Sequence, residues 1–151
     1  ARFGNEVAFD GASFKSERTL FDDATFSGEF TSFGRAVFSG ENTRLDDATF
    51  GGRRTWFDDV TFGSRLTSFR RVTFSGNDTS FHHTKFTSKR TSFQRVTFSG
   101  RRISFEDPQT WVDFDVMMDW NRHPGSAIGP LPAQPASVHP REWPPVPRPA
   151  V

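Results

Sequence analysis

The stretch Val72-Thr73-Phe74-Ser75-Gly76-Asn77-Asp78-Thr79-Ser80-Phe81 recurs with variations along most of the chain. Phe74 and Phe81 are seven residues apart, and the next Phe, Phe86, follows five residues later. This alternation of seven and five predicts seventeen core positions, sixteen of which are Phe. They are Phe9, Phe14, Phe21, Phe26, Phe33, Phe38, Leu45, Phe50, Phe57, Phe62, Phe69, Phe74, Phe81, Phe86, Phe93, Phe98 and Phe105. Self-similarity at a fixed period is typical of a solenoid, in which each repeat packs on its neighbours.

The residue two positions before each core residue is small or β-branched, as Val72 and Thr79 illustrate. Residues i and i−2 of a β-strand point to the same face, so both should face the core, whereas Thr73 and Ser80 should face solvent. An unpaired buried hydroxyl costs about 1–3 kcal/mol, so we expect the inward Thr hydroxyls to bond neighbouring backbone at the corners. The chain thus divides into five-residue units of a small residue, a polar residue, Phe, a polar residue and a turn residue.

These units resemble the pentapeptide-repeat family, whose units carry a small residue two positions before Leu or Phe. The resemblance covers residues 1–107 and implies an all-β fold, a right-handed quadrilateral β-helix with one pentapeptide on each face. This chain departs from the family pattern because two extra residues follow every second unit. We expect the inserted pairs to form bulged corners. They are Glu17-Arg18, Glu29-Phe30, Glu41-Asn42, Arg53-Arg54, Arg65-Leu66, Asn77-Asp78, Lys89-Arg90 and Arg101-Arg102.

The insertions change the length of a coil. Four units with two inserted pairs give about 24 residues per coil and slightly over four coils before residue 107. A 12-residue coil is the alternative. It would enclose two Phe rings per layer in a very small perimeter, so the longer coil is preferred.

Two further segments follow the repeat. Residues 108–120 contain Trp111 and Trp120 and should cap the last hydrophobic layer, as a short helix or turn or as an extended strand. Residues 121–151 hold nine of the ten prolines and predict an extended tail that is either free or packed on the solenoid. Trp143 favours packing, and residues 143–147 also match a ligand for a proline-binding groove.

The composition narrows the class of protein. Without cysteine there is neither a disulfide framework nor a thiolate metal site. The sequence contains no apolar run long enough to span a membrane and no signal-peptide pattern, so we expect no membrane association of this segment and a cytoplasmic location. The chain begins at Ala1 partway through a repeat, so we interpret it as a fragment that can lack an N-terminal targeting region. The 16 Arg against 3 Lys indicate a GC-rich bacterial genome.

Charge is unevenly distributed although the net charge is +1. The net charge is −4 for residues 1–52, +7 for residues 53–106 and −2 for residues 107–151. The basic middle region is a candidate surface for a protein partner, against the alternative that it is only a solvated face. The candidate residues are Arg53, Arg54, Arg70, Arg71, Lys89, Arg90, Arg101 and Arg102, with the off-register aromatic Trp56.

Stacking at 24-residue intervals would place equivalent residues about 4.8 Å apart. In one column Asp46-Asp47 should meet Arg70-Arg71 across a coil boundary. Another column places two histidines between carboxylates, the only constellation in the sequence that hints at a metal site, namely His82, His83, Asp58, Asp59 and Glu106. Simple pairing of imidazole with carboxylate is preferred there, because no pocket is expected around them. A third column of outward Thr forms a flat uncharged face, for which ice binding is a remote alternative to ordinary strand composition.

No catalytic constellation or phosphate-binding loop is recognisable, so we expect neither an enzyme nor a cofactor. The preferred hypothesis is a non-enzymatic binding or structural solenoid that presents a rigid surface to a protein partner. The resemblance implies an alternative, since some pentapeptide-repeat proteins mimic DNA and bind and protect type II topoisomerases. That role requires a solenoid whose surface is negatively charged along its length. Nucleic-acid binding through Arg-rich corners ranks third, because exposed stacking aromatics are few. A homodimer or end-to-end association is also left open.

Overall fold

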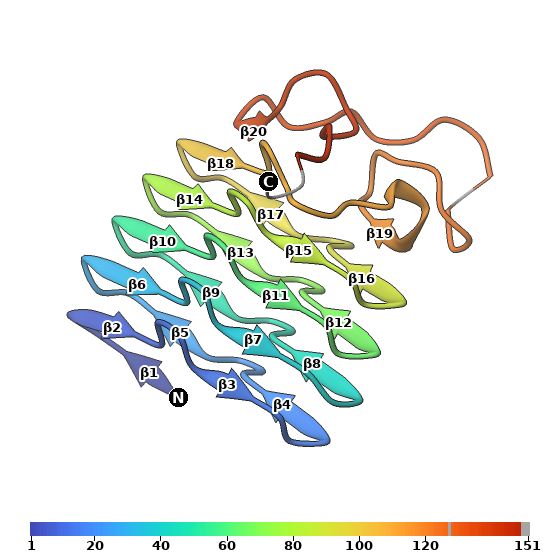
Figure 1. Cartoon of the computed structure of the whole chain (residues 1–151). Coiled ribbons are helices and arrows are strands. Elements are labelled where there is room, and N and C mark those ends of the chain that lie inside the picture. Colours follow the sequence, from blue (N-terminus) through green and yellow to red (C-terminus); the bar gives the residue numbers. More distant parts are fainter. Residues whose placement is uncertain (127, 149–151) are drawn as a thin grey trace.

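The computed structural model describes residues 1–126 and 128–148. Ala127 and residues 149–151, with Pro149 of the predicted Pro-rich tail, lie outside the described residues. Within that range the chain is all-β, with short parallel strands on four faces and no α-helix. Successive coils stack along one axis, and the C-terminal segment lies over one end of the stack (Figure 1).

Four parallel sheets form the faces of the solenoid. Sheet A contains β1 (Arg2–Phe3), β5 (Thr25–Phe26), β9 (Thr49–Phe50), β13 (Thr73–Phe74) and β17 (Thr97–Phe98). Sheet B contains β2 (Glu6–Ala8), β6 (Phe30–Ser32), β10 (Arg54–Trp56), β14 (Asp78–Ser80), β18 (Arg102–Ser104) and β20 (Val138–His139). Sheet C contains β3 (Ser13–Phe14), β7 (Val37–Phe38), β11 (Thr61–Phe62) and β15 (Lys85–Phe86). Sheet D contains β4 (Arg18–Leu20), β8 (Asn42–Arg44), β12 (Leu66–Ser68), β16 (Arg90–Ser92) and β19 (Val116–Met117).

The register of these sheets gives the coil length. Thr25 pairs with Thr49, and Thr49 pairs with Thr73, so one coil contains 24 residues. The predicted 24-residue coil is confirmed, and the 12-residue alternative is wrong. The chain needs four strands to return to the same sheet, which leaves room inside for the large Phe rings.

Tight turns follow sheets B and D. In the turn Phe33–Ala36 the N–H of Ala36 donates to the carbonyl oxygen of Phe33 at 2.9 Å, and Arg35 has a φ of 58°. The third residue of such a turn needs positive φ and is usually Gly or Asn. In this chain the third turn residue recurs every twelve residues and is neither Gly nor Asn at most of the turns. The residues with positive φ at this position include Asp23, Arg35, Asp47, Asp59, Arg71, His83 and Arg95. The paired polar residues that the sequence placed in surface columns therefore sit at tight turns.

Two wider corners connect the other faces. The predicted bulge is only partly correct, because each inserted pair is divided between a bend and a strand: Arg54 is the first residue of β10 and Arg102 is the first residue of β18. Strands of sheets B and D within the repeat consequently have three residues, whereas those of sheets A and C have two. We call the corner between sheets A and B the glycine corner, with Gly28, Gly52, Gly76 and Gly100. We call the corner between sheets C and D the serine corner, with Ser16, Gly40, Ser64 and Ser88.

Stacked Phe rings fill the interior. Rings 24 positions apart are nearly parallel, as for Phe26 and Phe50, whose centroids are 4.7 Å apart at 1°, and for Phe57 and Phe81, at 4.7 Å and 4°. Rings on adjacent faces meet edge to face, which gives the interior the density of a normal core. The predicted Phe ladder is confirmed. Three of its rings, in the first coil, are only half-buried: Phe9, Phe14 and Phe21.

The inward Thr hydroxyls do not behave alike. Thr84 donates to the carbonyl oxygen of Phe81 at 2.6 Å, as predicted for these hydroxyls. Thr43 instead bonds the hydroxyl of Ser64 at 2.6 Å. Thr31 and Thr55 have buried hydroxyls with no hydrogen-bond partner among the described residues. The expectation of backbone partners at the corners is therefore wrong for these three.

The segment after the repeat continues the stack before leaving it. Thr110 forms a bridge to Lys85 on sheet C, a 3-10 turn (η1, Asp113–Asp115) follows, and β19 then pairs with β16. Turn and strand are thus both present, where the sequence left them as alternatives. Three Trp rings cover the last Phe layer, namely Trp111, Trp120 and Trp143.

The Pro-rich tail lies against the solenoid through β20, which adds to sheet B beside β18. Val138 is fully buried, and Pro145 of the proline-rich stretch is buried too. In the part of the chain that the structure describes, no helix has the length and apolar character needed to cross a bilayer.

Candidate partner-binding groove

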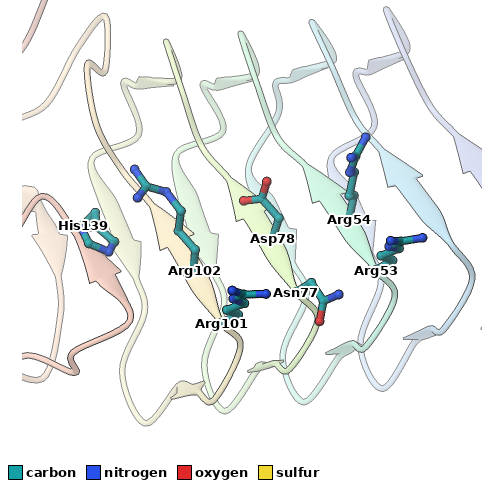
Figure 2. A pocket seen from close by; sticks show the side chains of 7 residues that line it. All are labelled: Arg53, Arg54, Asn77, Asp78, Arg101, Arg102 and His139. Carbon is teal, nitrogen blue, oxygen red and sulfur yellow. The ribbon is translucent and has the colours of Figure 1, made fainter.

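Four of the predicted partner-binding residues gather beside the glycine corner (Figure 2). They line a shallow groove of about 480 Å³, which we call the arginine groove. Its lining consists of Arg53, Arg54, Asn77, Asp78, Arg101, Arg102 and His139. The tail supplies one of these residues, because His139 belongs to β20.

Strand register explains why the groove forms. Arg54 pairs with Asp78 and Asp78 pairs with Arg102, so the three residues come from successive strands of sheet B. Figure 2 shows the shorter Asn77-Asp78 pair between two Arg-Arg pairs, which leaves a hollow at the middle coil. Two coil steps of about 4.8 Å separate the Arg pairs by roughly 10 Å.

The groove is positively charged, with four guanidinium groups against the carboxylate of Asp78. Arg53 approaches Glu29 at 3.8 Å, and Arg102 contacts Glu106 at 2.7 Å. Arg54 and Arg101 form no ion pair with the described residues. The groove therefore has guanidinium donors available for an incoming anion.

A second hollow of about 400 Å³ adjoins the groove on sheet B and shares Asp78 and Arg102 with it. Trp56 forms one of its walls. The ring of Trp56 meets that of Phe30 edge to face at 4.8 Å, and both side chains are half-buried. Trp56 and Phe30 therefore cover part of each other and flank the arginine groove.

Arg70 and Arg71 lie elsewhere, at a tight turn after sheet D. Arg71 contacts Asp47 through two hydrogen bonds of 2.9 Å each, so the predicted contact between the acidic and basic halves of this column is confirmed. The hydrogen bond and charge of Arg71 lower the pKa of the Asp47 carboxyl. This arginine serves contact between coils and is not brought to the groove.

Lys89 and Arg90 lie at the serine corner, a different edge of the solenoid from the groove. In the coil below them Arg65 approaches Glu41 at 3.7 Å. The eight predicted basic residues thus divide among three places, and only the glycine corner brings four of them together.

The hypothesised metal constellation does not form. His83 Nδ1 lies 3.7 Å from Asp59 Oδ1, and the rings of His82 and His83 stack at 4.0 Å. Asp58 instead accepts hydrogen bonds from the N–H of His82 and the hydroxyl of Ser80. Among the described residues no three His, Asp or Glu side chains come together as ligands. The weaker alternative, a metal site from His82, His83, Asp58, Asp59 and Glu106, is therefore not gathered as a ligand group in the described residues.

Sequence reasoning missed a ladder of Asp side chains that ties one coil to the next. Asp46 Oδ1 accepts the N–H of Arg70 at 3.0 Å and the hydroxyl of Ser68. Asp22 accepts the N–H of Asp46 at 3.0 Å, and burial raises the pKa of its carboxyl against the lowering effect of Arg44. The signal was an Asp followed 22 residues later by Ser, a separation that becomes meaningful only once the coil length is known.

Comparisons with protein-family models, with curated proteins and with solved structures found no match. The structure itself therefore defines the class, an all-β parallel solenoid with 24-residue coils and a Phe ladder. These features are consistent with a repeat solenoid such as a pentapeptide-repeat protein.

Proposed function

We propose that this chain is a non-enzymatic binding solenoid of the pentapeptide-repeat type, and that its arginine groove binds an acidic region of a protein partner. The observation that carries the proposal is the gathering of four Arg side chains in one groove, with Arg54 and Arg101 not committed to ion pairs with described residues. Guanidinium groups bind carboxylates through paired hydrogen bonds, which suits recognition of an acidic surface.

Backbone hydrogen bonds between coils hold the strands beneath the groove, which supports a binding role. The N–H of Arg54, of Asp78 and of Arg102 each donates to the preceding coil at 3.1 Å. Because these bonds already hold the Arg backbone in place, binding would not add a cost for ordering the backbone, although the Arg side chains would still lose freedom. A filled solenoid has no internal pocket, so recognition on an outer face is the natural mode.

The alternatives receive less support. A DNA mimic that binds type II topoisomerase needs a rod negative along its length, whereas the arginine groove carries an excess of positive charge. Direct nucleic-acid binding has the right sign of charge, but Trp56 and Phe30 are half-buried against each other and offer little open ring surface for base stacking. A cytoplasmic location belongs to the same proposal, on the ground that the chain has no cysteine.

A capture experiment with matched variants tests the proposal. The wild-type chain, Arg54→Ser/Arg102→Ser and Arg65→Ser/Lys89→Ser are immobilised, and each is exposed to extract of the source cells. Each double variant removes two positive charges, but only the first removes them from the groove. We expect the wild type and the serine-corner variant to retain the same acidic protein and the groove variant to lose it.

A partner retained equally by all three would show that binding does not use the groove. A retained species that disappears after nuclease treatment would show that the ligand is nucleic acid. Either result contradicts the proposed function.

A further inference from the structure

We infer that the segment recognised by the arginine groove is an extended acidic peptide in the polyproline II conformation, with two carboxylates three residues apart. The inference rests on the proposed function and specifies its ligand. It follows from the spacing of the Arg pairs and from the polar residues between them.

The spacing of the charges selects the ligand. The pairs Arg53-Arg54 and Arg101-Arg102 are two coils apart, a rise of roughly 10 Å. A polyproline II segment rises about 3.1 Å per residue with three residues per turn, so residues i and i+3 lie on one side about 9.3 Å apart. In a β-strand, residues on the same side recur every second residue, at about 6.7 Å or 13 Å. Of these two extended conformations, polyproline II comes closer to the spacing of the two Arg pairs.

The centre of the groove excludes a continuous chain of negative charge. Asp78 and Asn77 stand between the two Arg pairs (Figure 2). A carboxylate there repels an anion but accepts hydrogen bonds from N–H groups. A peptide can place uncharged residues and a backbone N–H opposite Asp78, whereas a polynucleotide strand would bring a run of phosphates past it. The alternation of positive, negative and positive groups therefore favours the peptide.

The same centre favours an extended peptide over a helix. The backbone of a polyproline II segment makes no internal hydrogen bonds, so its N–H groups are available to Asp78. An α-helix has already used its N–H groups within itself, apart from those of its first turn. A helix could place carboxylates near the Arg pairs but would leave Asp78 facing side chains only.

Fluorescence anisotropy with three dye-labelled peptides tests the spacing. Each carries two Glu residues between Pro flanks, with the central sequence Glu-Ala-Glu, Glu-Pro-Ala-Glu or Glu-Pro-Ala-Pro-Glu. We expect the wild-type chain to bind the second peptide about tenfold more tightly than the other two, the effect of one additional charge-assisted contact. Arg53→Ser/Arg54→Ser and Arg101→Ser/Arg102→Ser should each abolish this preference, whereas Arg65→Ser/Lys89→Ser should leave it unchanged.

Equal affinity for the three peptides, with all three weakened by the groove variants, would overturn the inferred spacing and leave the proposed function intact. Failure of every peptide together with failure of the capture experiment would overturn both. A single-stranded oligonucleotide that binds more tightly than the second peptide would identify nucleic acid as the ligand and overturn the inference.

Asp78→Ala gives a second and independent test. Removal of this carboxylate should weaken binding of the Glu-Pro-Ala-Glu peptide, because an N–H acceptor is lost, and should strengthen binding of the oligonucleotide, because a repulsive charge is lost. Stronger binding of both ligands would show that Asp78 acts only as a repulsive charge, which contradicts the role assigned to it.

Discussion

The glycine corner and the serine corner carry the chain between sheets in similar ways, yet they are stabilised by opposite means. At the serine corner, Ser64 and Ser88 point inward and bond Thr43 and Thr67 at 2.6 Å and 2.9 Å. Each Ser lies 21 residues after its Thr. Side chains therefore brace this corner from inside.

At the glycine corner the same offset leads from Thr55 to Gly76, where no hydroxyl is available. A Cβ on Gly76 would lie 1.9 Å from the carbonyl oxygen of Gly52, so no larger residue fits without a backbone shift. The close approach of successive coils leaves the hydroxyls of Thr31 and Thr55 without partners among the described residues. On its inner side this corner has backbone contact in place of side-chain hydrogen bonds among the described residues, and its outer side carries the arginine groove.

The difference teaches that a strict repeat can specialise its edges without changing its path. At the serine corner, Ser64 and Ser88 form hydrogen bonds inside the solenoid. The glycine corner leaves its interior bonding incomplete and holds four Arg side chains close together outside. Substitutions at equivalent positions should consequently have unequal effects on stability and on binding.

The largest effect is expected for Gly76→Ala. The added methyl group would overlap the Gly52 carbonyl oxygen, so the coils must separate locally, at a cost of about 3 kcal/mol or more in the free energy of unfolding. Denaturant unfolding followed by circular dichroism measures the change. Gly51→Ala is the matched control, because its Cβ would come no closer than 3.4 Å to another atom, the Ser75 hydroxyl oxygen. Equal losses for the two variants would show that close coil approach does not explain the glycine.

A smaller loss is expected for Ser64→Ala at the serine corner. The substitution leaves the buried Thr43 hydroxyl without its partner, at a cost of about 1–2 kcal/mol. Chemical denaturation of the single variant and of Ser64→Ala/Thr43→Val provides the measurement. The double variant should recover part of the loss, because no unpaired hydroxyl is left. A double variant less stable than the single one would contradict the proposed bracing.

Replacement of an inward Thr by Val should change the free energy of unfolding in opposite directions at the two corners. Thr55→Val removes an unpaired buried hydroxyl and should raise the free energy of unfolding by about 1 kcal/mol, whereas Thr43→Val should lower it by about 1 kcal/mol. Inward positions of sheet B already hold Val7, Ile103 and Val138, so an apolar residue fits this column. Thermal unfolding of both variants tests the prediction, and a common sign would refute it.

The smallest effect is expected for the exposed ion pairs of the two corners. Arg53→Ser removes the contact with Glu29 and Arg65→Ser removes the contact with Glu41, at 3.8 Å and 3.7 Å. Exposed pairs contribute about 0–1 kcal/mol, so both variants should unfold within roughly 0.5 kcal/mol of the wild type. A large loss for either one in a denaturant titration would disqualify it as a binding probe.

Much of the fold could be predicted because one side chain at one spacing dominates the interior. The Phe rhythm is sufficient to indicate the strands, the 24-residue coil and the ladder of rings. The division of each inserted pair between bend and strand could not be predicted, since Arg54 and Arg102 read equally well as corner or as strand residues.

The candidate site could be predicted only as a set of charges. Arg53-Arg54 and Arg101-Arg102 were identifiable from sequence, but so were Lys89-Arg90 and Arg70-Arg71, which lie elsewhere. Two features of the three-dimensional structure determine which of these basic pairs form the groove. The glycine and serine corners are distinct edges, and the tail returns to place His139 beside the upper Arg pair. Trp143 favours packing of the tail, but no local pattern in the tail indicates that His139 lies beside the groove.

The glycine corner should bind an acidic ligand and the serine corner should not. One measurement tests this difference most directly. Affinity for the Glu-Pro-Ala-Glu peptide is determined by isothermal titration calorimetry for Arg53→Ser/Arg101→Ser and for Arg65→Ser/Lys89→Ser, which remove two positive charges from equivalent positions of the glycine and serine corners. We predict a loss of about tenfold or more for the first variant and of less than about twofold for the second. Equal losses would show that only total charge attracts the acidic ligand and would contradict the assignment of the arginine groove as the binding site.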